Sequence, residues 1–239
     1  MSDNVFSILT VCTGNVCRSP AVERLLASEL GPTVKVASAG THALVGHPIS
    51  EPMAALLRSK GIREMPFAAR RLSEQLLKET DLVLPLTRAQ RGLVVELWPA
   101  VVRRTFTLRE FARLLGSVDQ AAISETSPAE RLRAAIPLAA AQRGRERAMP
   151  QEDDVVDPYR LGDEVYSESF GQIFSAVQVI IRFATGASSG LLSPQPLPPA
   201  GEMRRISNEA SSECREHRTP LRPHIEPKSE ESTQRHAGL

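Results

Sequence analysis

The feature that most constrains this chain is the segment Val11–Pro20, which reads V-C-T-G-N-V-C-R-S-P. The residues before it, Val5–Val11, are mostly apolar and β-branched, which predicts a buried parallel strand. The residues after it, Pro20–Leu30, are rich in Ala, Leu and Glu, which predicts a helix. We expect Ser19 at the N-cap of this helix and Pro20 in its first turn. The segment is therefore a tight loop between a strand and a helix.

A loop of this kind is suited to bind an anion. Its successive N–H groups converge, and the helix N-terminus adds about half a positive charge. Arg18 adds a planar fork that matches two oxygens of a phosphate. Gly14 and Asn15 tolerate the positive φ that such a tight loop requires. The loop residues that we expect to bind phosphate are Thr13, Gly14, Asn15, Val16, Cys17 and Ser19.

Cys12 is the candidate nucleophile, because it lies where the predicted strand meets the loop. A thiol at a helix N-terminus or beside a cation ionises more easily than an ordinary cysteine, whose pKa is about 8.5. The Ser19 hydroxyl is placed to hydrogen-bond the sulfur and to help it leave in a later step. The alternative is a small buried hydrophobic residue, as a lone cysteine at a strand end often is. The Gly, Asn and Ser at their positions in the loop favour the catalytic interpretation.

This segment resembles the phosphate-binding loop of the low-molecular-weight protein tyrosine phosphatases. The similarity continues through Ser38–Ile49 (S-A-G-T-H-A-L-V-G-H-P-I) and Asp81–Arg91 (D-L-V-L-P-L-T-R-A-Q-R). It ends with Asp157–Tyr159 (D-P-Y) and covers roughly residues 5–184. The resemblance implies a protein tyrosine phosphatase that acts on phosphotyrosine, or an aryl phosphate, through a cysteinyl-phosphate intermediate. Cys12 is then the nucleophile and Arg18 the phosphate-binding cation.

The same resemblance implies a general acid, which the leaving phenolate needs. The family carries this acid in a D-P-aromatic loop before the last helix, and Asp157 occupies that position. Asp153 and Asp154 are the alternatives, because they lie only a few residues away. Asn15 would brace the loop and Ser38 would join its hydrogen bonds. The walls of the cleft would be formed by His42, Leu44 and Val45 on one side and Tyr159 on the other.

Several alternatives stay open. An arsenate reductase would use the same loop, but its thioredoxin-linked form needs further cysteines in the fold, and 38–150 contains none. A catalytically inactive phosphotyrosine-binding protein is the third interpretation, although the intact Cys12, Arg18 and Asp157 argue against it. Cys12 and Cys17 either form a reversible disulfide or leave Cys17 as a packing residue. The histidines lack metal-ligand spacing, so we expect neither a metal nor another cofactor.

Composition narrows the possible binding partners and the cellular location. Lys and Arg number 29 and Asp and Glu 28, so no general affinity for nucleic acid or anionic membrane is expected. Three cysteines, two in one loop, fit a reducing compartment. The polar Met1–Asn4 leads directly into a strand, so no signal peptide is expected. The longest apolar stretch, Ile173–Ala184, is too short for a membrane span, so we expect a cytoplasmic protein.

The pattern along the chain predicts an α/β fold, a doubly wound four-stranded parallel sheet with helices on both faces. The expected strands are 5–11, 33–37, 81–86 and 101–106. The expected helices are 20–30, 50–61, 73–79, 87–98, 107–115, 127–143 and 164–183. Residues 1–185 form the predicted phosphatase-like domain, in which the segment 116–150 is a helical insertion. Its thin apolar stripe (Leu132, Ile136, Leu138) predicts light packing on the body, with a partner site as the alternative. Residues 186–239 are Pro- and Ser-rich, which predicts a disordered tail that has no role or binds a protein partner.

Overall fold

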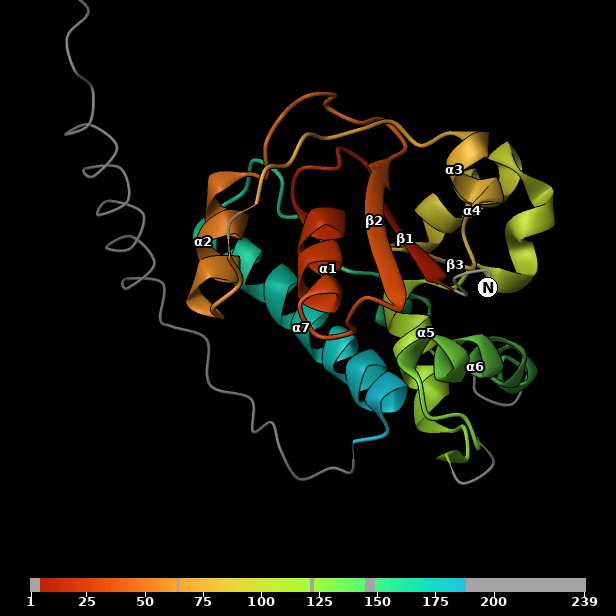
Figure 1. Ribbon diagram of the computed structural model, residues 1–239. Coiled ribbons are helices and arrows are strands. Elements are labelled where there is room, and N and C mark those ends of the chain that lie inside the picture. The colour runs from red at the N-terminus through yellow and green to blue at the C-terminus, as the bar shows by residue number, and fades with distance from the viewer. Residues whose placement is uncertain (1–4, 64, 121–122, 145–148, 188–239) are drawn as a thin grey trace, which may run out of the picture.

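The computed structural model describes residues 5–63, 65–120, 123–144 and 149–187. Its centre is a parallel sheet of three strands in the order β2-β1-β3 (Figure 1). The strands are β1 (Phe6–Cys12), β2 (Val34–Gly40) and β3 (Leu82–Pro85). The register pairs Cys12 of β1 with Gly40 of β2 and Val11 with Pro85 of β3. The carboxyl ends of the strands therefore meet at one edge, where the loop after β1 begins.

The predicted fourth strand is wrong. Its residues form the 3-10 helix η1 (Pro99–Arg104), in which Pro99 occupies the first turn. Proline presets a helical φ, and the helix α5 already begins at Leu108, so little extended chain is left between the two. Only Thr105 and Phe106 reach the sheet, through one parallel bridge from Thr105 to Val83 and one bond from Phe106 N to Val83 O (3.1 Å).

Helices cover both faces of the sheet, as predicted. Along β1, alternate side chains enter two separate apolar clusters: Phe6 and Ile8 enter one, Leu9 and Val11 the other. The first cluster is completed by α1 (Arg18–Ala27), α2 (Glu51–Ser59), α5 (Leu108–Gly116), α6 (Pro128–Gln142) and α7 (Asp163–Thr185). The second is completed by α3 (Glu74–Lys78), α4 (Arg88–Leu97) and η1. Figure 1 shows α1, α2 and α7 on one side of the strands and α3 and α4 on the other.

Side-chain caps fix most helix starts. Thr107 and Glu110 form a capping box at α5, where each side chain bonds the other's backbone N–H. Ser127 caps α6 and Thr87 caps α4, in each case by accepting from the N–H three residues on. Thr87 and Gln90 have the residue types and spacing of a capping box, but only half of it forms, because the Gln90 side chain turns towards the loop after β1.

The helix α6 packs more tightly than its sequence predicted. Leu132, Ala135 and Ala139 are fully buried against α5, α7 and β1, because small alanines allow the helices to approach closely. The guanidinium of Arg131 donates from Nε to the carbonyl of Phe183 (2.8 Å) and from Nη1 to that of Glu125 (3.1 Å). The insertion is thus tied to the end of α7.

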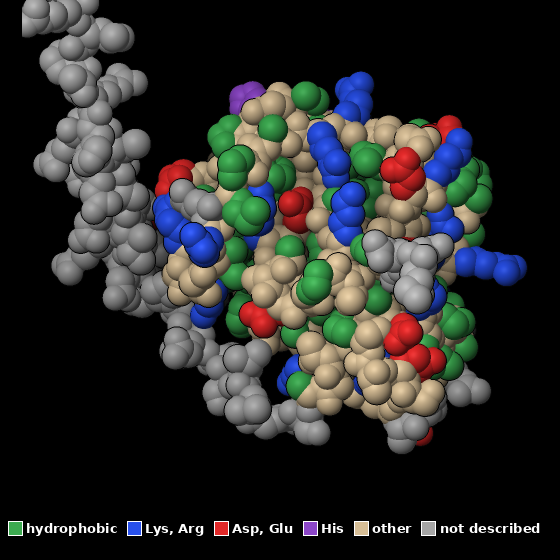
Figure 2. All heavy atoms as spheres, viewed as in Figure 1, with side chains coloured by type: hydrophobic (Ala, Val, Ile, Leu, Met, Phe, Trp, Pro, Cys, Tyr) green, Lys and Arg blue, Asp and Glu red, His purple; other side chains and the backbone are tan. Residues whose placement is uncertain are grey.

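Three sequence-based expectations concern the surface charge, membrane spans and the C-terminal tail. Figure 2 shows Lys, Arg, Asp and Glu side chains interspersed over one face, in keeping with the near-zero net charge. Among the described helices, none is both long and apolar enough to cross a bilayer. The predicted disordered tail, residues 186–239, lies almost entirely outside the described residues, as does Cys214.

Candidate active site

The candidate site is the loop between β1 and α1. Cys12 ends β1, and α1 begins at Arg18, two residues earlier than it would with Ser19 at the N-cap. Cys17 occupies the N-cap without a capping hydrogen bond from its side chain, and Ser19 lies inside the first turn. The Ser19 hydroxyl is therefore free to bond elsewhere, and it donates to Cys12 Sγ (3.0 Å).

Cys12 lies at the bottom of this loop and is 2% exposed. Its sulfur accepts one bond from the Asn15 N–H (3.2 Å) and one from the Ser19 hydroxyl. Both donors point at the sulfur and hold it at the base of the loop. The N-terminus of α1 adds its partial positive charge at the same place.

Asn15 holds the loop in shape. It is fully buried and has φ 56°, in the left-handed region that Asn adopts more readily than most residues. Its amide donates to Ser19 Oγ (3.0 Å) and Ser38 Oγ (2.8 Å), and its oxygen accepts from the Arg70 N–H (2.9 Å). Ser38 donates in turn to Glu23 (2.5 Å). The loop is thus braced by β2 and by the segment around Arg70.

Arg18 is 3% exposed, and its guanidinium is only partly paired. Nη1 donates to the Val155 carbonyl (3.2 Å), and Nη2 forms an ion pair with Asp157. Among the described residues, no partner accepts from the buried Nε of Arg18. An unpaired buried donor is unfavourable, so this atom is suited to an incoming anion.

Asp157 is brought to Arg18 across 139 positions of sequence. Its side chain is 49% exposed, and its Oδ1 accepts from the Tyr159 N–H (3.2 Å). The preceding chain is anchored by bonds from Val155 N to Leu86 O (2.9 Å) and from Val156 N to the Gln172 side chain (3.0 Å).

The two alternative acids are engaged elsewhere. Asp153 pairs with Arg113 (3.1 Å), and Asp154 accepts from the Arg88 N–H (2.7 Å). Neither lines the pocket around Cys12, whereas Asp157 does. The geometry therefore favours Asp157 among the three.

A pocket of about 140 Å³ opens above Cys12. It brings together most of the predicted site residues: Cys12, Thr13, Gly14, Val16, Cys17, Arg18, His42, Leu44, Asp157 and Tyr159. Asn15 and Ser19 lie behind the loop as its supports. Val45, which the resemblance placed on the wall, does not line the pocket and is 67% exposed.

Cys17 contacts two hydroxyl groups, from the half-buried Ser50 and the buried Tyr166. Its sulfur lies 3.1 Å from the Ser50 hydroxyl and 3.5 Å from the Tyr166 hydroxyl. Burial raises the pKa of the Cys17 thiol, against the opposing effect of these two hydrogen bonds. Cys12 and Cys17 are both unbridged, and a disulfide between them stays a prediction.

Four residues near the loop were not predicted. Gln90 of α4 donates to the Thr13 hydroxyl (3.1 Å), and the Arg70 side chain donates to the Ser38 carbonyl (2.8 Å). Glu23 accepts the hydrogen bond that the Ser38 hydroxyl donates, as described above. Gly40 lies so close that a Cβ would stand 2.5 Å from the Thr13 carbonyl. These contacts join distant segments, and only the glycine after a strand could have indicated a close approach.

No cluster of three or more metal-binding side chains occurs among the described residues. The site consists of a thiol, a partly paired guanidinium and a carboxylate around a small pocket, which is a constellation for phosphoryl transfer to sulfur.

Comparison with known proteins identifies the family. The family model described as low molecular weight phosphotyrosine protein phosphatase matches residues 7–135, more than half of the chain. The chain therefore belongs to this family. The match ends before Asp157, so the role of that residue rests on the geometry and on the D-P-Y resemblance.

Three bacterial proteins illustrate the similarity. The low molecular weight protein-tyrosine-phosphatase Etp of Escherichia coli K12 is 41% identical over 99 residues, which cover 41% of this chain and 66% of Etp, just under two thirds. A protein-arginine-phosphatase of Geobacillus stearothermophilus is 41% identical over 110 residues (44% of this chain, 71% of that protein). Among solved structures, the Erwinia amylovora tyrosine phosphatase AmsI superimposes with a TM-score of 0.55 at 25% identity, covering 74% of this chain and 92% of that one.

Proposed function

We propose that this protein is a protein tyrosine phosphatase that hydrolyses phosphotyrosine through a cysteinyl-phosphate intermediate. The observation that carries the proposal is the meeting of Cys12, Arg18 and Asp157 in one pocket of about 140 Å³. A pocket of this size accepts a phosphorylated side chain and no more. The buried position of Cys12 favours a long phosphorylated side chain over phosphoserine.

In the first step, Cys12 Sγ attacks phosphorus, and an S–P bond forms as the bond to the phenolic oxygen breaks. Asp157, as the acid, donates its proton to that oxygen, and tyrosine leaves. Arg18 and the loop N–H groups hold the phosphoryl oxygens. Arg18 reaches this role by exchanging the Asp157 carboxylate for the phosphate, which frees the carboxyl for the leaving group.

In the second step, water attacks phosphorus of the cysteinyl phosphate, and Asp157 takes its proton. The S–P bond breaks, phosphate is released, and the sulfur leaves as a thiolate. The Ser19 hydroxyl, 3.0 Å from the sulfur, stabilises that leaving thiolate. Neither step requires a metal ion or a redox partner.

Phosphoarginine is the second candidate substrate, because one relative is named a protein-arginine-phosphatase. A guanidinium needs hydrogen-bond acceptors along the wall of its pocket, whereas a phenyl ring needs apolar contact. The pocket presents Val16 and Leu44 on its walls, which favours the ring. Arsenate reduction has less support, because Cys12 and Cys17 are the only cysteines of the described residues.

The wider context of the activity is also a proposal. We propose one phosphatase domain over residues 1–185 that includes α6, a phosphorylated protein as substrate, and a cytoplasmic location that suits an ionisable thiol. Whether 186–239 binds a protein partner is open to a deletion experiment.

The test compares phosphate release from one peptide carrying phosphotyrosine and from its phosphoarginine counterpart. We expect the phosphotyrosine peptide to be hydrolysed faster, Cys12→Ser to abolish turnover, and Asp157→Asn to lower kcat by about 10²–10⁴. Faster release from phosphoarginine would overturn the substrate assignment. Turnover by Cys12→Ser would overturn the mechanism.

A further inference from the structure

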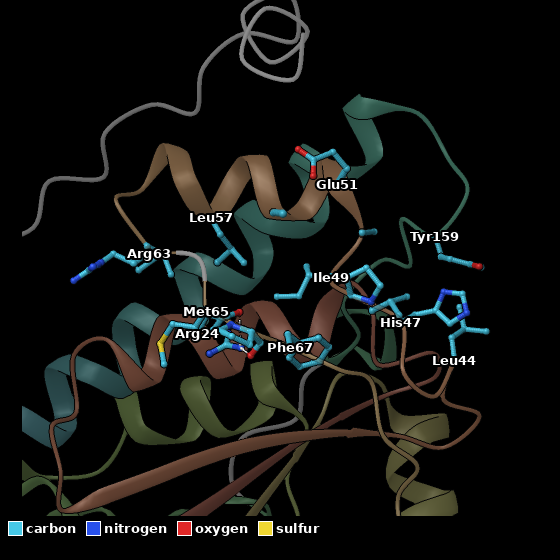
Figure 3. A pocket seen from close by; sticks show the side chains of 16 residues that line it. Arg24, Leu44, His47, Ile49, Glu51, Leu57, Arg63, Met65, Phe67 and Tyr159 are labelled. Atoms are coloured by element: carbon cyan, nitrogen blue, oxygen red, sulfur yellow. Dashed lines mark hydrogen bonds between the residues drawn. The ribbon is translucent and has the colours of Figure 1, made fainter. Parts of the chain in front are cut away.

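A second, larger cavity adjoins the catalytic pocket. It has a volume of about 730 Å³ and lies between α1, α2 and the chain that follows α2 (Figure 3). We call it the α1–α2 cavity. It shares Val16, Leu44 and Tyr159 with the catalytic pocket, so the two hollows adjoin along this rim.

The walls of the α1–α2 cavity are mainly apolar. Ile49 and Leu57 lie on one side and Phe67 and Met65 on the other, as Figure 3 shows, and Ile62 completes the lining. Apolar walls with a few polar groups and a volume of several hundred Å³ are typical of sites that bind a ligand.

Arg24 makes the lower wall rigid. Its Nη2 donates to the carbonyls of Met65 (3.4 Å) and Pro66 (3.1 Å), and its guanidinium lies 5.7 Å from the centre of the Phe67 ring. The carboxylate of Glu51, at the other wall, is paired with Arg58 (2.5 Å). Arg24 and Glu51 are therefore already engaged, and the Arg63 side chain extends away from the cavity (Figure 3). An apolar group can therefore enter without separating Arg24 or Glu51 from its partner.

A peptide substrate must leave the catalytic pocket over this rim or over the opposite one. The catalytic pocket has room for one phosphorylated side chain, so the neighbouring residues of the peptide lie outside it. An extended peptide advances about 3.3 Å per residue. A residue within three positions of the phosphotyrosine therefore reaches the adjoining cavity.

We propose that the α1–α2 cavity binds a bulky apolar side chain that flanks the phosphotyrosine of a peptide substrate. This inference rests on the proposed function and specifies the class of substrate: phosphotyrosine in an apolar rather than a polar sequence. The occupant is a part of the substrate itself, because the cavity adjoins the pocket that holds the phosphate and shares three lining residues with it.

The experiment uses a set of phosphotyrosine peptides in a Gly/Ser background, with one Leu placed in turn at each position from three before to three after the phosphotyrosine. p-Nitrophenyl phosphate serves as the substrate without flanks. We expect kcat/KM to rise about tenfold for Leu at one position or more, as burial of an apolar side chain in a pocket of this kind allows.

Two variants test where the Leu binds. Ala54→Phe fills the cavity from α2. Met65→Glu places a charge on the rim of the cavity, where Met65 is 64% exposed. Both should abolish the Leu preference and leave hydrolysis of p-nitrophenyl phosphate unchanged. Ala27→Phe on the exposed side of α1 is the matched control and should keep the preference.

The outcomes separate the two proposals. Hydrolysis of p-nitrophenyl phosphate with no Leu preference overturns this inference and leaves the phosphatase assignment intact. No hydrolysis of any substrate overturns the proposed function itself. A Leu preference that survives in both Ala54→Phe and Met65→Glu places the apolar residue elsewhere and contradicts the inference. Equal loss on all substrates in both variants would mean that the cavity supports the active site, and it contradicts the inference too.

Discussion

Replacing Asn15 should separate two contributions to the stability of the loop. Asn15→Ala removes three hydrogen bonds, to Ser19, Ser38 and the Arg70 N–H. At about 1 kcal/mol each they amount to about 3 kcal/mol. The alanine also keeps φ 56°, which costs about 1 kcal/mol more. We therefore expect the free energy of unfolding to fall by about 3–4 kcal/mol.

Asn15→Gly is the matched variant, because glycine loses the same bonds but adopts a positive φ without strain. The greater freedom of glycine in the unfolded chain offsets part of this gain. We expect Asn15→Gly to be more stable than Asn15→Ala by about 0.5–1 kcal/mol. Urea unfolding followed by circular dichroism measures both values. A loss below about 1 kcal/mol for Ala would refute the role of these bonds, and a glycine variant less stable than alanine would refute the argument from φ.

The remaining predictions concern pH, the insertion and the ion pair. Burial raises the pKa of the Tyr166 hydroxyl to about 12. The protonated hydroxyl therefore contributes its full stability below about pH 10, and this contribution is lost as the pH rises towards 12. Tyr166→Phe should flatten this part of the pH dependence of the free energy of unfolding. Arg131→Met should lower the free energy of unfolding by about 2 kcal/mol, because it leaves the Phe183 carbonyl without its charged donor. Arg133→Met on the same helix is the control and should lower the free energy of unfolding by less than about 1 kcal/mol. Asp157→Asn should bind inorganic phosphate about three- to tenfold more tightly at pH 7 by calorimetry, since no carboxylate competes for Arg18; weaker binding would contradict the proposed exchange.

The loop could be predicted from the sequence because its parts are contiguous. A strand, a Gly-Asn loop and a helix start lie within about fifteen residues, and the local pattern determines each of them. Cys12, Arg18 and the loop residues therefore lie together as expected. The predicted cap at Ser19 was wrong by two residues, since Cys17 is the N-cap and the helix begins at Arg18.

What could not be predicted depends on contacts between distant segments. The pairing of Asp157 with Arg18 spans 139 positions and follows from the packing of the chain before α7. Gln90 fits a capping pattern, but a tertiary contact with Thr13 determines its orientation. Such tertiary contacts override local propensity.

The fourth strand was wrongly predicted for a local reason. Pro99 starts a helical turn where the β-branched pattern indicated extended chain.

The most direct test of the covalent mechanism is a rapid-mixing measurement with Asp157→Asn and excess p-nitrophenyl phosphate. Nitrophenolate leaves with little need of an acid, whereas hydrolysis of the cysteinyl phosphate lacks its base. The account predicts a burst of nitrophenolate equal to the enzyme concentration, followed by slow turnover, with phosphate on the peptide that contains Cys12. The same burst in the double variant Cys12→Ser/Asp157→Asn, or nitrophenolate release without phosphorylated Cys12, would contradict it.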